Sequence, residues 1–417
     1  MKLKRFLAAV LATAALMGVT ACSGDSTSSV TSDPTSSVTS EESKADSSEA
    51  ETSKTEESSE AENSNMEQTT NSFKLTSENA KHIGRTYTDG DGTVWLSHSA
   101  SALEFTFTGA KASVTVCEDI AYGEGSEPRF AVYVNDERKV DHLLQEQEKT
   151  IEILSADSAK ETKVKIIKLS EAANSIFGVK SFETDATELK PTAEKDLKIE
   201  FIGDSITCGY GVDDEVKENH FSTATEDATR AYAYKTAMNL DADYSLVSFS
   251  GHGIISGYSG DGKKQEAQIV PTFYEKVARN YSGSKIVEND WDFSRFTPDI
   301  IVINLGTNDN SYVKKDKEKE AEYTQGYVDF LKQIRAKNPD AAILCTLGVM
   351  GAELFYPMKH AVDAYKKETG DTNIDSLSFE VQNAADGYAA DWHPTEKTHT
   401  KAADRLTLKI NYMLGNQ

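Results

Sequence analysis

Five compact apolar segments in the C-terminal half of the chain constrain its fold more than any other feature. They are LKIEFIG, YSLVSFSG, DIIVINLG, AAILCTLG and LSFEV, and several lie near longer amphipathic stretches. Compact apolar runs are typical of strands buried on both faces, and amphipathic stretches are typical of the helices that connect such strands. Residues 195–415 are therefore predicted to form a three-layer α/β/α domain with a parallel, flavodoxin-like sheet.

Residues 73–190 show a different pattern, a series of short alternating segments. In ALEFTFTG, the apolar Leu103, Phe105 and Phe107 alternate with Glu and Thr, and ASVTV, RFAVYVND, TIEIL and KVKIIKL follow. A period of two, interrupted by Gly, Asn and Asp, is typical of antiparallel strands. We expect an all-β domain of the jelly-roll or sandwich type, either a carbohydrate-binding module or a structural support.

The chain begins with a pattern typical of a secretory signal, residues 1–22. A basic start precedes a short apolar run and the sequence Val-Thr-Ala-Cys, which ends at Cys22. Small residues directly before a cysteine resemble the lipobox of bacterial lipoproteins, which implies that Cys22 is lipidated. We expect a secreted protein anchored by this lipid to the extracellular face of the bacterial cell membrane, with a plain signal peptide as the alternative.

Residues 23–72 are nearly all Ser, Thr, Glu, Ala and Asp. A segment with so few large apolar residues cannot build a core, so we expect a disordered, acidic linker. The whole chain carries a formal net charge of −24 at pH 7. Because no basic stripe is present, we do not expect nucleic acid as a partner.

Besides Cys22 the chain has three cysteines, Cys117, Cys208 and Cys345. Their spacing matches no metal-ligand pattern, and the sequence contains neither His-Glu-x-x-His nor Cys-x-x-Cys. We therefore expect neither a zinc nor an iron–sulfur site, and we expect these cysteines to be small buried residues.

The first three apolar segments of the α/β region run into turns that contain Gly203, Gly251 and Gly306. In an open α/β sheet the ligand crevice lies outside the carboxyl ends of the strands, so these turns are expected to meet at one crevice. Ser205, within IEFIGDSITCGYG, follows the first strand and is a candidate nucleophile. The alternative is an ordinary Gly-Asp-Ser turn.

A nucleophilic serine needs donors for the oxyanion that forms when it attacks an ester. The backbone N–H groups of Ser205 and Gly251 and the side-chain amide of Asn308, two residues after Gly306, are candidates for this oxyanion hole.

The serine also needs a general base, and the segment AADWHPTEKTH near the C-terminus offers His393. Asp391, two residues earlier, is positioned in the sequence to take the second N–H of its imidazole. His252, beside Gly251, is a rival base. His399 falls within a helical pattern and is expected to face solvent.

Gly-Asp-Ser, then Gly, then Gly-x-Asn, then a late Asp and His resemble the SGNH (GDSL-type) hydrolase superfamily over residues 196–414. With the preceding β domain, the spelling GDSITCGYG and the late DWHP, the chain is similar to carbohydrate esterase family two. The resemblance implies an acetyl esterase that acts on acetylated plant polysaccharide or oligosaccharide of the xylan or mannan type, without a cofactor. It implies Ser205 as nucleophile, Gly251 and Asn308 as oxyanion donors, and His393 as base.

The superfamily pattern has its Asp three residues before the His, whereas Asp391 is two before His393. Members of the family also work with a Ser-His dyad in which a backbone carbonyl holds the imidazole. The sequence therefore leaves open whether Asp391 completes a triad.

Aromatic residues in the expected loops are candidates for stacking on sugar rings or for packing the loops. They are Trp392, Trp291, Tyr210 and Tyr258. Two other functions stay open: an SGNH esterase for another acyl donor (a lipid, a thioester or peptidoglycan O-acetyl groups), and a non-catalytic carbohydrate-binding surface protein.

Overall fold

The structure, a computed structural model, describes residues 70–119, 125–279, 284, 286 and 289–415. The expected signal segment, including Cys22, and the expected linker up to residue 69 lie outside the described residues. Met66–Gln417 form one compact unit, which contains two β-sheets. Among the described residues, no helix combines the length and the apolar character needed to cross a membrane.

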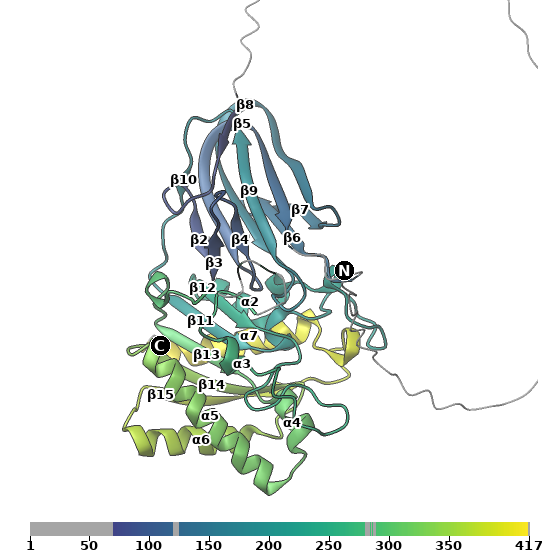
Figure 1. The fold of residues 1–417 in the computed structure, drawn as a ribbon, viewed down its shortest axis with the longest axis vertical. Helices are drawn as coiled ribbons and strands as arrows, with labels where there is room; N and C mark the ends of the chain where they lie inside the picture. The colour runs from purple at the N-terminus through teal and green to yellow at the C-terminus, as the bar shows by residue number, and fades with distance from the viewer. Residues whose placement is uncertain (1–69, 120–124, 280–283, 285, 287–288, 416–417) are drawn as a thin grey trace, which may run out of the picture. The chain divides into compact units, whose positions relative to one another are not determined.

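The five expected apolar segments form one parallel sheet, as predicted (Figure 1). Its strand order is β12-β11-β13-β14-β15. The strands are β11 Lys198–Gly203, β12 Asp243–Ser248, β13 Ile300–Asn304, β14 Ala342–Val349 and β15 Ile374–Val381. β11 pairs in parallel with β12 on one side and β13 on the other, so the winding reverses at β11. A ligand crevice is expected where the order reverses, beyond the carboxyl end of β11.

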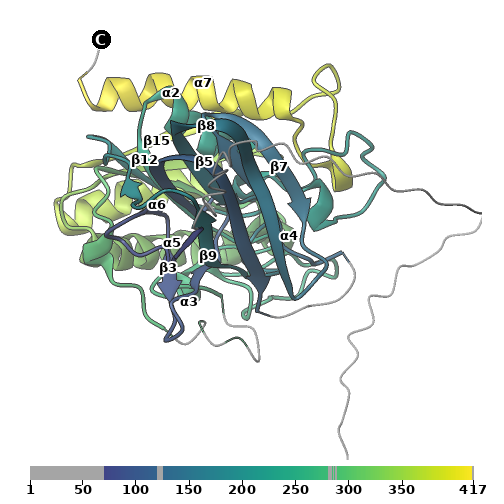
Figure 2. The ribbon, with the colours of Figure 1, turned by 90° about the horizontal axis from the view of Figure 1, so that it is seen from above.

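Helices cover both faces of the parallel sheet and complete the three layers (Figure 2). α2 and α7 pack on one face, and α3, α4, α5 and α6 pack on the other. Their bounds are α2 Tyr232–Asn239, α3 Val270–Phe273, α4 Thr307–Val313, α5 Lys317–Lys337, α6 Phe355–Thr369 and α7 Glu396–Met413. In α5 the buried residues recur at helical spacing, as in Tyr323, Tyr327 and Ile334, and Asp316 caps its first turn.

The expectation for His399 in α7 is wrong, because its side chain is fully buried and not solvent-facing. Its Nδ1 accepts a hydrogen bond from the Tyr232 N–H at 3.2 Å, and its ring lies parallel to that of Tyr232. This residue joins the two helices that cover one face of the sheet, and its buried Nδ1 bonds a backbone donor that the sequence pattern does not reveal.

The N-terminal region is antiparallel, as expected, but its ten described strands belong to one hydrogen-bonded sheet, so a jelly roll is not confirmed. The strands are β1 Asn71–Phe73, β2 Lys81–Ile83, β3 Thr86–Thr88, β4 Val94–Leu96, β5 Ala102–Glu118, β6 Arg129–Val134, β7 Glu137–Leu143, β8 Glu148–Lys168, β9 Phe177–Thr184 and β10 Lys190–Pro191. The long strands β5 and β8 shift register near Gly109 and Ala112. Such bulges bend a strand, so one sheet can curl around its own apolar face.

The two sheets share part of their hydrophobic core. Ile167, near the end of β8, and Leu169, just after it, belong to the same buried cluster as Phe201 of β11 and Tyr244 of β12. A buried ion pair also joins Lys81 of β2 to Asp243 of β12 at 2.5 Å. The antiparallel sheet therefore contributes to the packing of the parallel sheet beside it.

Candidate active site

Ser205 lies at the end of a sharp strand-to-helix turn. β11 ends at Gly203, and the short helix α1, Ser205–Cys208, starts at the serine. Asp204 caps α1, because its carboxylate accepts the Ile206 N–H at 3.1 Å. A Cβ at position 203 would lie 2.0 Å from Thr207 Oγ1, so the turn has room only for glycine there.

The structure brings Ser205 and His393 together across 188 positions of sequence. Ser205 Oγ and His393 Nε2 are 2.9 Å apart, and His393 Nδ1 lies 3.2 Å from the Ala390 carbonyl. A carbonyl accepts only, so Nδ1 carries the hydrogen and the unprotonated Nε2 faces the serine hydroxyl. Burial lowers the pKa of His393 to about 4. The imidazole is therefore neutral near pH 7 and able to take the serine proton.

The expected hydrogen bond from Asp391 to the imidazole is not made. The Asp391 carboxylate instead accepts from Tyr210 Oη at 2.7 Å and Phe221 N at 3.0 Å, and it pairs with His220 Nδ1 at 2.9 Å. The physical reason is backbone geometry: Asp391 and Trp392 have φ of 49° and 62°, in the left-handed region. This turn aims the side chain away from the imidazole and leaves the Ala390 carbonyl beside Nδ1.

The Asp391 carboxylate acts as a brace between two loops. Burial raises its pKa, but the hydrogen bonds from Tyr210, His220 and Phe221 outweigh this and hold the pKa below its usual value. The same Tyr210 ring stacks on the His393 ring with a centroid distance of 3.8 Å. Tyr210 therefore belongs to the site, where it covers one face of the imidazole.

Two of the three expected oxyanion donors are unpaired at the carboxyl edge of the sheet. Within the described part of the chain, the N–H groups of Ser205 and Gly251 have no hydrogen-bond partner. Gly251 has φ of 74°, and a Cβ there would meet no atom within 4 Å, so this turn borders open space. Asn308 Nδ2 donates to the His252 carbonyl at 2.9 Å and to Asp204 Oδ2 at 3.3 Å.

Asp204 and Asp309 are buried carboxyl groups that hold these turns. Burial raises the pKa of Asp204 to about 7 and that of Asp309 to about 6. The Asp309 carboxylate accepts the N–H groups of three consecutive residues in the loop after β12, at 2.8 to 3.1 Å; they are Ile254, Ile255 and Ser256. Asp309 therefore braces the neighbouring loop.

Two further candidates, His252 and Trp291, make no described contact with Ser205 or His393. The rival base His252 packs against Phe249 and Phe273, and its Nδ1 contacts the Ser250 carbonyl at 2.8 Å. Trp291 is 5% exposed and lies between Arg85 and Arg295. It lines a cavity with Lys198 and Asp243, the first residues of β11 and β12. Trp291 therefore lies at the opposite edge of the sheet from Ser205 and packs there, which is the second of its two alternatives.

Trp392 and Tyr258 do have exposed side chains. Trp392 is 51% exposed, contacts Tyr388 at a centroid distance of 5.2 Å and has Lys217 Nζ 4.5 Å above its ring. Tyr258 is 64% exposed and its N–H donates to the Gly251 carbonyl at 2.8 Å. Trp392 directly precedes His393 in the sequence, and Tyr258 bonds the backbone of the Gly251 turn, so each exposed ring belongs to a segment that carries part of the site.

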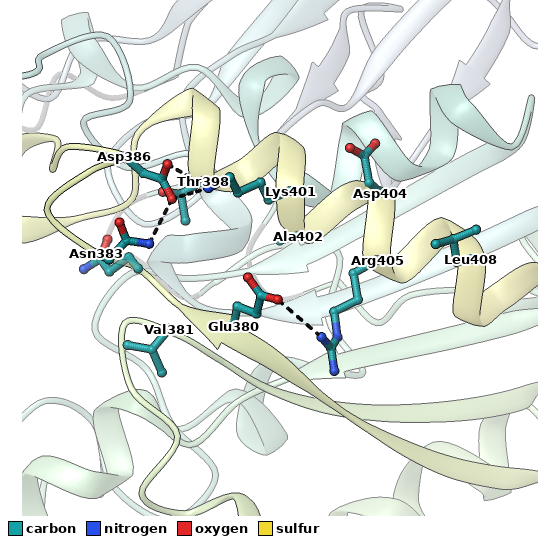
Figure 3. Close-up of a pocket in the computed structure, with 11 residues that line it drawn as sticks. Glu380, Val381, Asn383, Asp386, Thr398, Lys401, Ala402, Asp404, Arg405 and Leu408 are labelled. Carbon is teal, nitrogen blue, oxygen red and sulfur yellow. Dashed lines mark hydrogen bonds and ion pairs between the residues drawn. The ribbon is translucent and has the colours of Figure 1, made fainter.

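The loop between β15 and α7 carries His393 and is anchored at Asp386 (Figure 3). Asp386 pairs with Lys401 at 2.6 Å and accepts from Asn383 Nδ2 at 3.0 Å, and its carbonyl accepts from Thr395 Oγ1 at 2.9 Å. Asp386 lines a groove of about 420 Å³ between β15 and α7. Neither Ser205 nor His393 lines this groove, so it lies apart from the reacting pair.

Among the described residues, one group has the atoms and proximity of metal ligands: Glu171, Cys208 and Glu226, with one ligand atom each within 4.8 Å of the others. Both carboxylates already accept backbone N–H groups, from Ser250 and Glu171. The buried Lys168 ammonium lies beside them and disfavours a cation. All three described cysteines, Cys117, Cys208 and Cys345, are free and buried, as predicted.

Sequence reasoning allowed for a backbone carbonyl beside the imidazole but did not identify it as that of Ala390, and it missed the Glu171 carboxylate. A backbone acceptor has no residue signature, and Glu171 reaches the site from the antiparallel region, 79 positions before its partner Ser250. The left-handed backbone at Asp391 and Trp392 had only a weak local signal, since Asp tolerates this region but neither residue is a glycine.

Comparison with known families divides the chain in the same way as its two sheets. Residues 201–401 match the GDSL-like Lipase/Acylhydrolase family, and residues 82–192 match the family described as Carbohydrate esterase 2 N-terminal.

Among curated proteins, the chain is 32% identical over 323 residues to Cellulase/esterase CelE of Acetivibrio thermocellus, covering 76% of this chain but only 37% of that protein. It is 26% identical over 347 residues to an acetylxylan esterase / glucomannan deacetylase of Cellvibrio japonicus, covering 83% of this chain and 92% of that protein.

Among solved structures, the chain is similar to a family two carbohydrate esterase from Clostridium thermocellum in complex with cellohexaose. The TM-score is 0.71 at 30% identity, covering 81% of this chain and 100% of that one. An acetyl xylan esterase from the rumen bacterium Butyrivibrio proteoclasticus has the same fold, with a TM-score of 0.75 at 23% identity, covering 83% of this chain and 99% of that one.

Proposed function

Because the chain belongs to carbohydrate esterase family two, within the GDSL-like hydrolases, we propose that it is a serine esterase that removes O-acetyl groups from polysaccharide of the xylan or mannan type. One observation carries the proposal: the 2.9 Å contact between Ser205 Oγ and the unprotonated His393 Nε2. A serine hydroxyl bonded to a neutral imidazole is the arrangement from which acyl transfer starts. The name of the Cellvibrio relative supports xylan and glucomannan as the substrate class.

In this reaction Ser205 Oγ attacks the acetyl carbonyl carbon while His393 Nε2 takes the hydroxyl proton. The tetrahedral intermediate collapses, the sugar oxygen leaves with that proton, and the acetyl group stays on Ser205. Water then gives a proton to His393 and attacks the acetyl carbonyl carbon. The bond to Ser205 Oγ breaks, Oγ takes the proton back from His393, and acetate is released. The Ala390 carbonyl accepts Nδ1–H at 3.2 Å throughout, which supports a Ser-His dyad with a backbone carbonyl rather than a triad with Asp391.

The N–H groups of Ser205 and Gly251 and the amide of Asn308 are proposed to hold the oxyanion. The contact of Asn308 Nδ2 with Asp204 is long, at 3.3 Å, so this N–H can be shared with a developing negative charge. Removing one donor of this kind lowers kcat by about 10² to 10³ in serine hydrolases.

The partner polysaccharide is proposed to contact Trp392, the exposed aromatic residue next to His393. Stacking on a sugar ring adds affinity for a polymer but does not affect an acetyl ester without a sugar. Replacing Trp392 with Ala should therefore raise KM for acetylated xylan and leave KM for a small synthetic acetyl ester unchanged.

Secretion and anchoring belong to the proposal as well. Residues 1–22 are proposed to direct export, Cys22 to carry the lipid that holds the protein on the extracellular face of the membrane, and residues 23–72 to act as the tether. Labelled palmitate should enter the full-length protein produced in a bacterial host, and a Cys22→Ser variant should remain unlabelled.

The function is tested by acetate release from acetylated xylan, acetylated mannan and a short synthetic acetyl ester, with Ser205→Ala as the control. Release that is lost in Ser205→Ala supports the proposal. If the unmutated protein releases no acetate, the proposal is contradicted. Activity on longer acyl esters would then indicate another acyl donor. Glycan binding by Ser205→Ala would indicate a binding protein.

A further inference from the structure

The connection between β8 and β9, residues 169–176, brings part of the antiparallel region against the candidate active site. The Leu169 carbonyl accepts the Ala228 N–H at 3.1 Å. The buried Lys168 ammonium donates to the carbonyls of Ser170 and Glu171 at 2.6 and 2.8 Å. These contacts hold the backbone of this connection in one place.

The Glu171 side chain extends from this connection and is fully buried. Its Oε2 accepts the Ser250 N–H at 2.7 Å and lies 3.6 Å from Cys208 Sγ. Ser250 directly precedes Gly251, and Cys208 lies on α1, which starts at Ser205. One carboxylate of the antiparallel region therefore contacts both backbone segments whose N–H groups are proposed to hold the oxyanion.

Two contacts hold the backbone around Ser250, one on the peptide that carries the Gly251 N–H and one on the peptide before it. Glu171 holds the N–H of Ser250, and His252 Nδ1 contacts the Ser250 carbonyl at 2.8 Å. Because a peptide is planar and trans, fixing the Ser250 carbonyl also fixes the Gly251 N–H, which points the opposite way.

Burying the Glu171 carboxylate disfavours folding, which a residue with only a structural role would have little reason to do. A buried carboxylate is destabilising unless it is well bonded, and apolar side chains of similar volume often replace buried charges without loss of stability. Burial raises the pKa of both Glu171 and the adjacent Glu226, which accepts the Glu171 N–H at 2.9 Å. The burial of these two carboxyl groups is explained if the hydrogen bonds that they make serve the reaction.

We propose that Glu171 is a positioning residue for the esterase: by accepting the Ser250 N–H, it orients the turn at Gly251 so that the Gly251 N–H faces the oxyanion. The inference rests on the proposed function and gives the antiparallel region a part in catalysis.

The test compares Glu171→Met, which keeps volume but has no hydrogen-bond acceptor, with Glu171→Gln, whose amide oxygen still accepts the Ser250 N–H. The substrate is 4-nitrophenyl acetate, and kcat, KM and Tm are measured on the full chain. We expect Glu171→Met to lower kcat by about 10- to 100-fold with KM nearly unchanged, since a misplaced donor weakens binding of the transition state and not of the ester. Glu171→Gln should recover most of this loss.

Asp243→Asn is the matched control. It weakens another buried contact between the two sheets, the ion pair with Lys81, but at the opposite end of β12 from Ser250. It should lower Tm and leave kcat unchanged.

A folded Glu171→Met protein with unchanged kcat would overturn the inference, as would an equal loss of kcat in Asp243→Asn. If Glu171→Met does not fold, the inference is tested with Glu171→Gln alone. A near-normal kcat in Glu171→Gln supports the inference. A loss of kcat as large as that expected for Glu171→Met overturns it. An unmutated protein without esterase activity contradicts the proposed function instead.

Discussion

His393 shows how its surroundings set the state of a single residue. Its ring is buried, stacked on Tyr210, and bonded at Nδ1 to the Ala390 carbonyl. Burial disfavours the charged imidazolium, so the pKa falls to about 4 from the usual 6.5. The imidazole is already the free base at the pH of most environments, without a carboxylate bonded to it.

This state predicts the acid limb of the pH profile. A general base works only when it is neutral, so kcat/KM should rise with pH through the pKa of His393, near pH 4, and stay high above it. The measurement is kcat/KM for a short acetyl ester from pH 3 to 8. An acid limb near pH 6.5 would show that the imidazole is solvated and contradict this account.

Asp391 leads to a second prediction at this scale. Because its carboxylate bonds Tyr210, His220 and Phe221, Asp391→Ala should loosen two loops without removing a bond to the imidazole. We expect kcat to fall by about tenfold or less, against about 10⁴ when a directly bonded carboxylate is replaced.

The control for Asp391→Ala is His220→Ala, which removes the most exposed of the three contacts and should have a smaller effect. A loss near 10⁴ in Asp391→Ala would mean that the carboxylate turns toward His393 in the working enzyme.

At the scale of elements, the site depends on turns at the carboxyl ends of β11, β12 and β13. Buried carboxyl groups hold the first two of these turns: Asp204 caps α1 after β11, and Asp309 and Glu171 both bond the loop after β12. Loops have few apolar contacts of their own. A buried carboxyl group that accepts their backbone N–H groups therefore holds them in one conformation.

Asp309→Ala should therefore be costly. It leaves the N–H groups of Ile254, Ile255 and Ser256 buried without acceptors, and we expect the free energy of unfolding to fall by about 3 kcal/mol or more. Urea unfolding measures this. Asp316→Ala, which removes an exposed cap of α5, is the control and should cost only about 1 kcal/mol. Equal losses would contradict the bracing role.

At the scale of the whole molecule, the two sheets are not independent. Ile167 and Leu169 of the antiparallel region share a buried cluster with Phe201 and Tyr244 of the parallel sheet. The Arg85 guanidinium, fully buried, pairs with Glu200 of β11 at 3.3 Å. Separating the sheets would expose this core and leave buried charges unpaired.

We therefore expect one cooperative unfolding transition for the region from residue 70 onward. Differential scanning calorimetry on the full chain should give a calorimetric enthalpy equal to the van't Hoff enthalpy. Two resolved transitions, or early melting of the antiparallel sheet in Asp243→Asn, would show that each sheet is stable alone.

Local patterns in the chain were enough to predict the parallel sheet, its covering helices and the antiparallel strands, because period-two and period-3.6 patterns are properties of neighbouring residues. They also placed Ser205 and Gly251 after adjacent strands, since the carboxyl ends of parallel strands share one edge. The jelly-roll form of the antiparallel region was not confirmed, because alternation specifies faces but not how a sheet curls.

Contacts between distant segments decided the rest. The left-handed backbone at Asp391 and Trp392 turned the carboxylate from His393 toward Tyr210 and Phe221, and Trp291 was placed at the far edge of the sheet. Glu171 reached Ser250 from another sheet. A residue's neighbours in space, its burial and a strained φ depend on the packing of the complete chain, so no local pattern carries them.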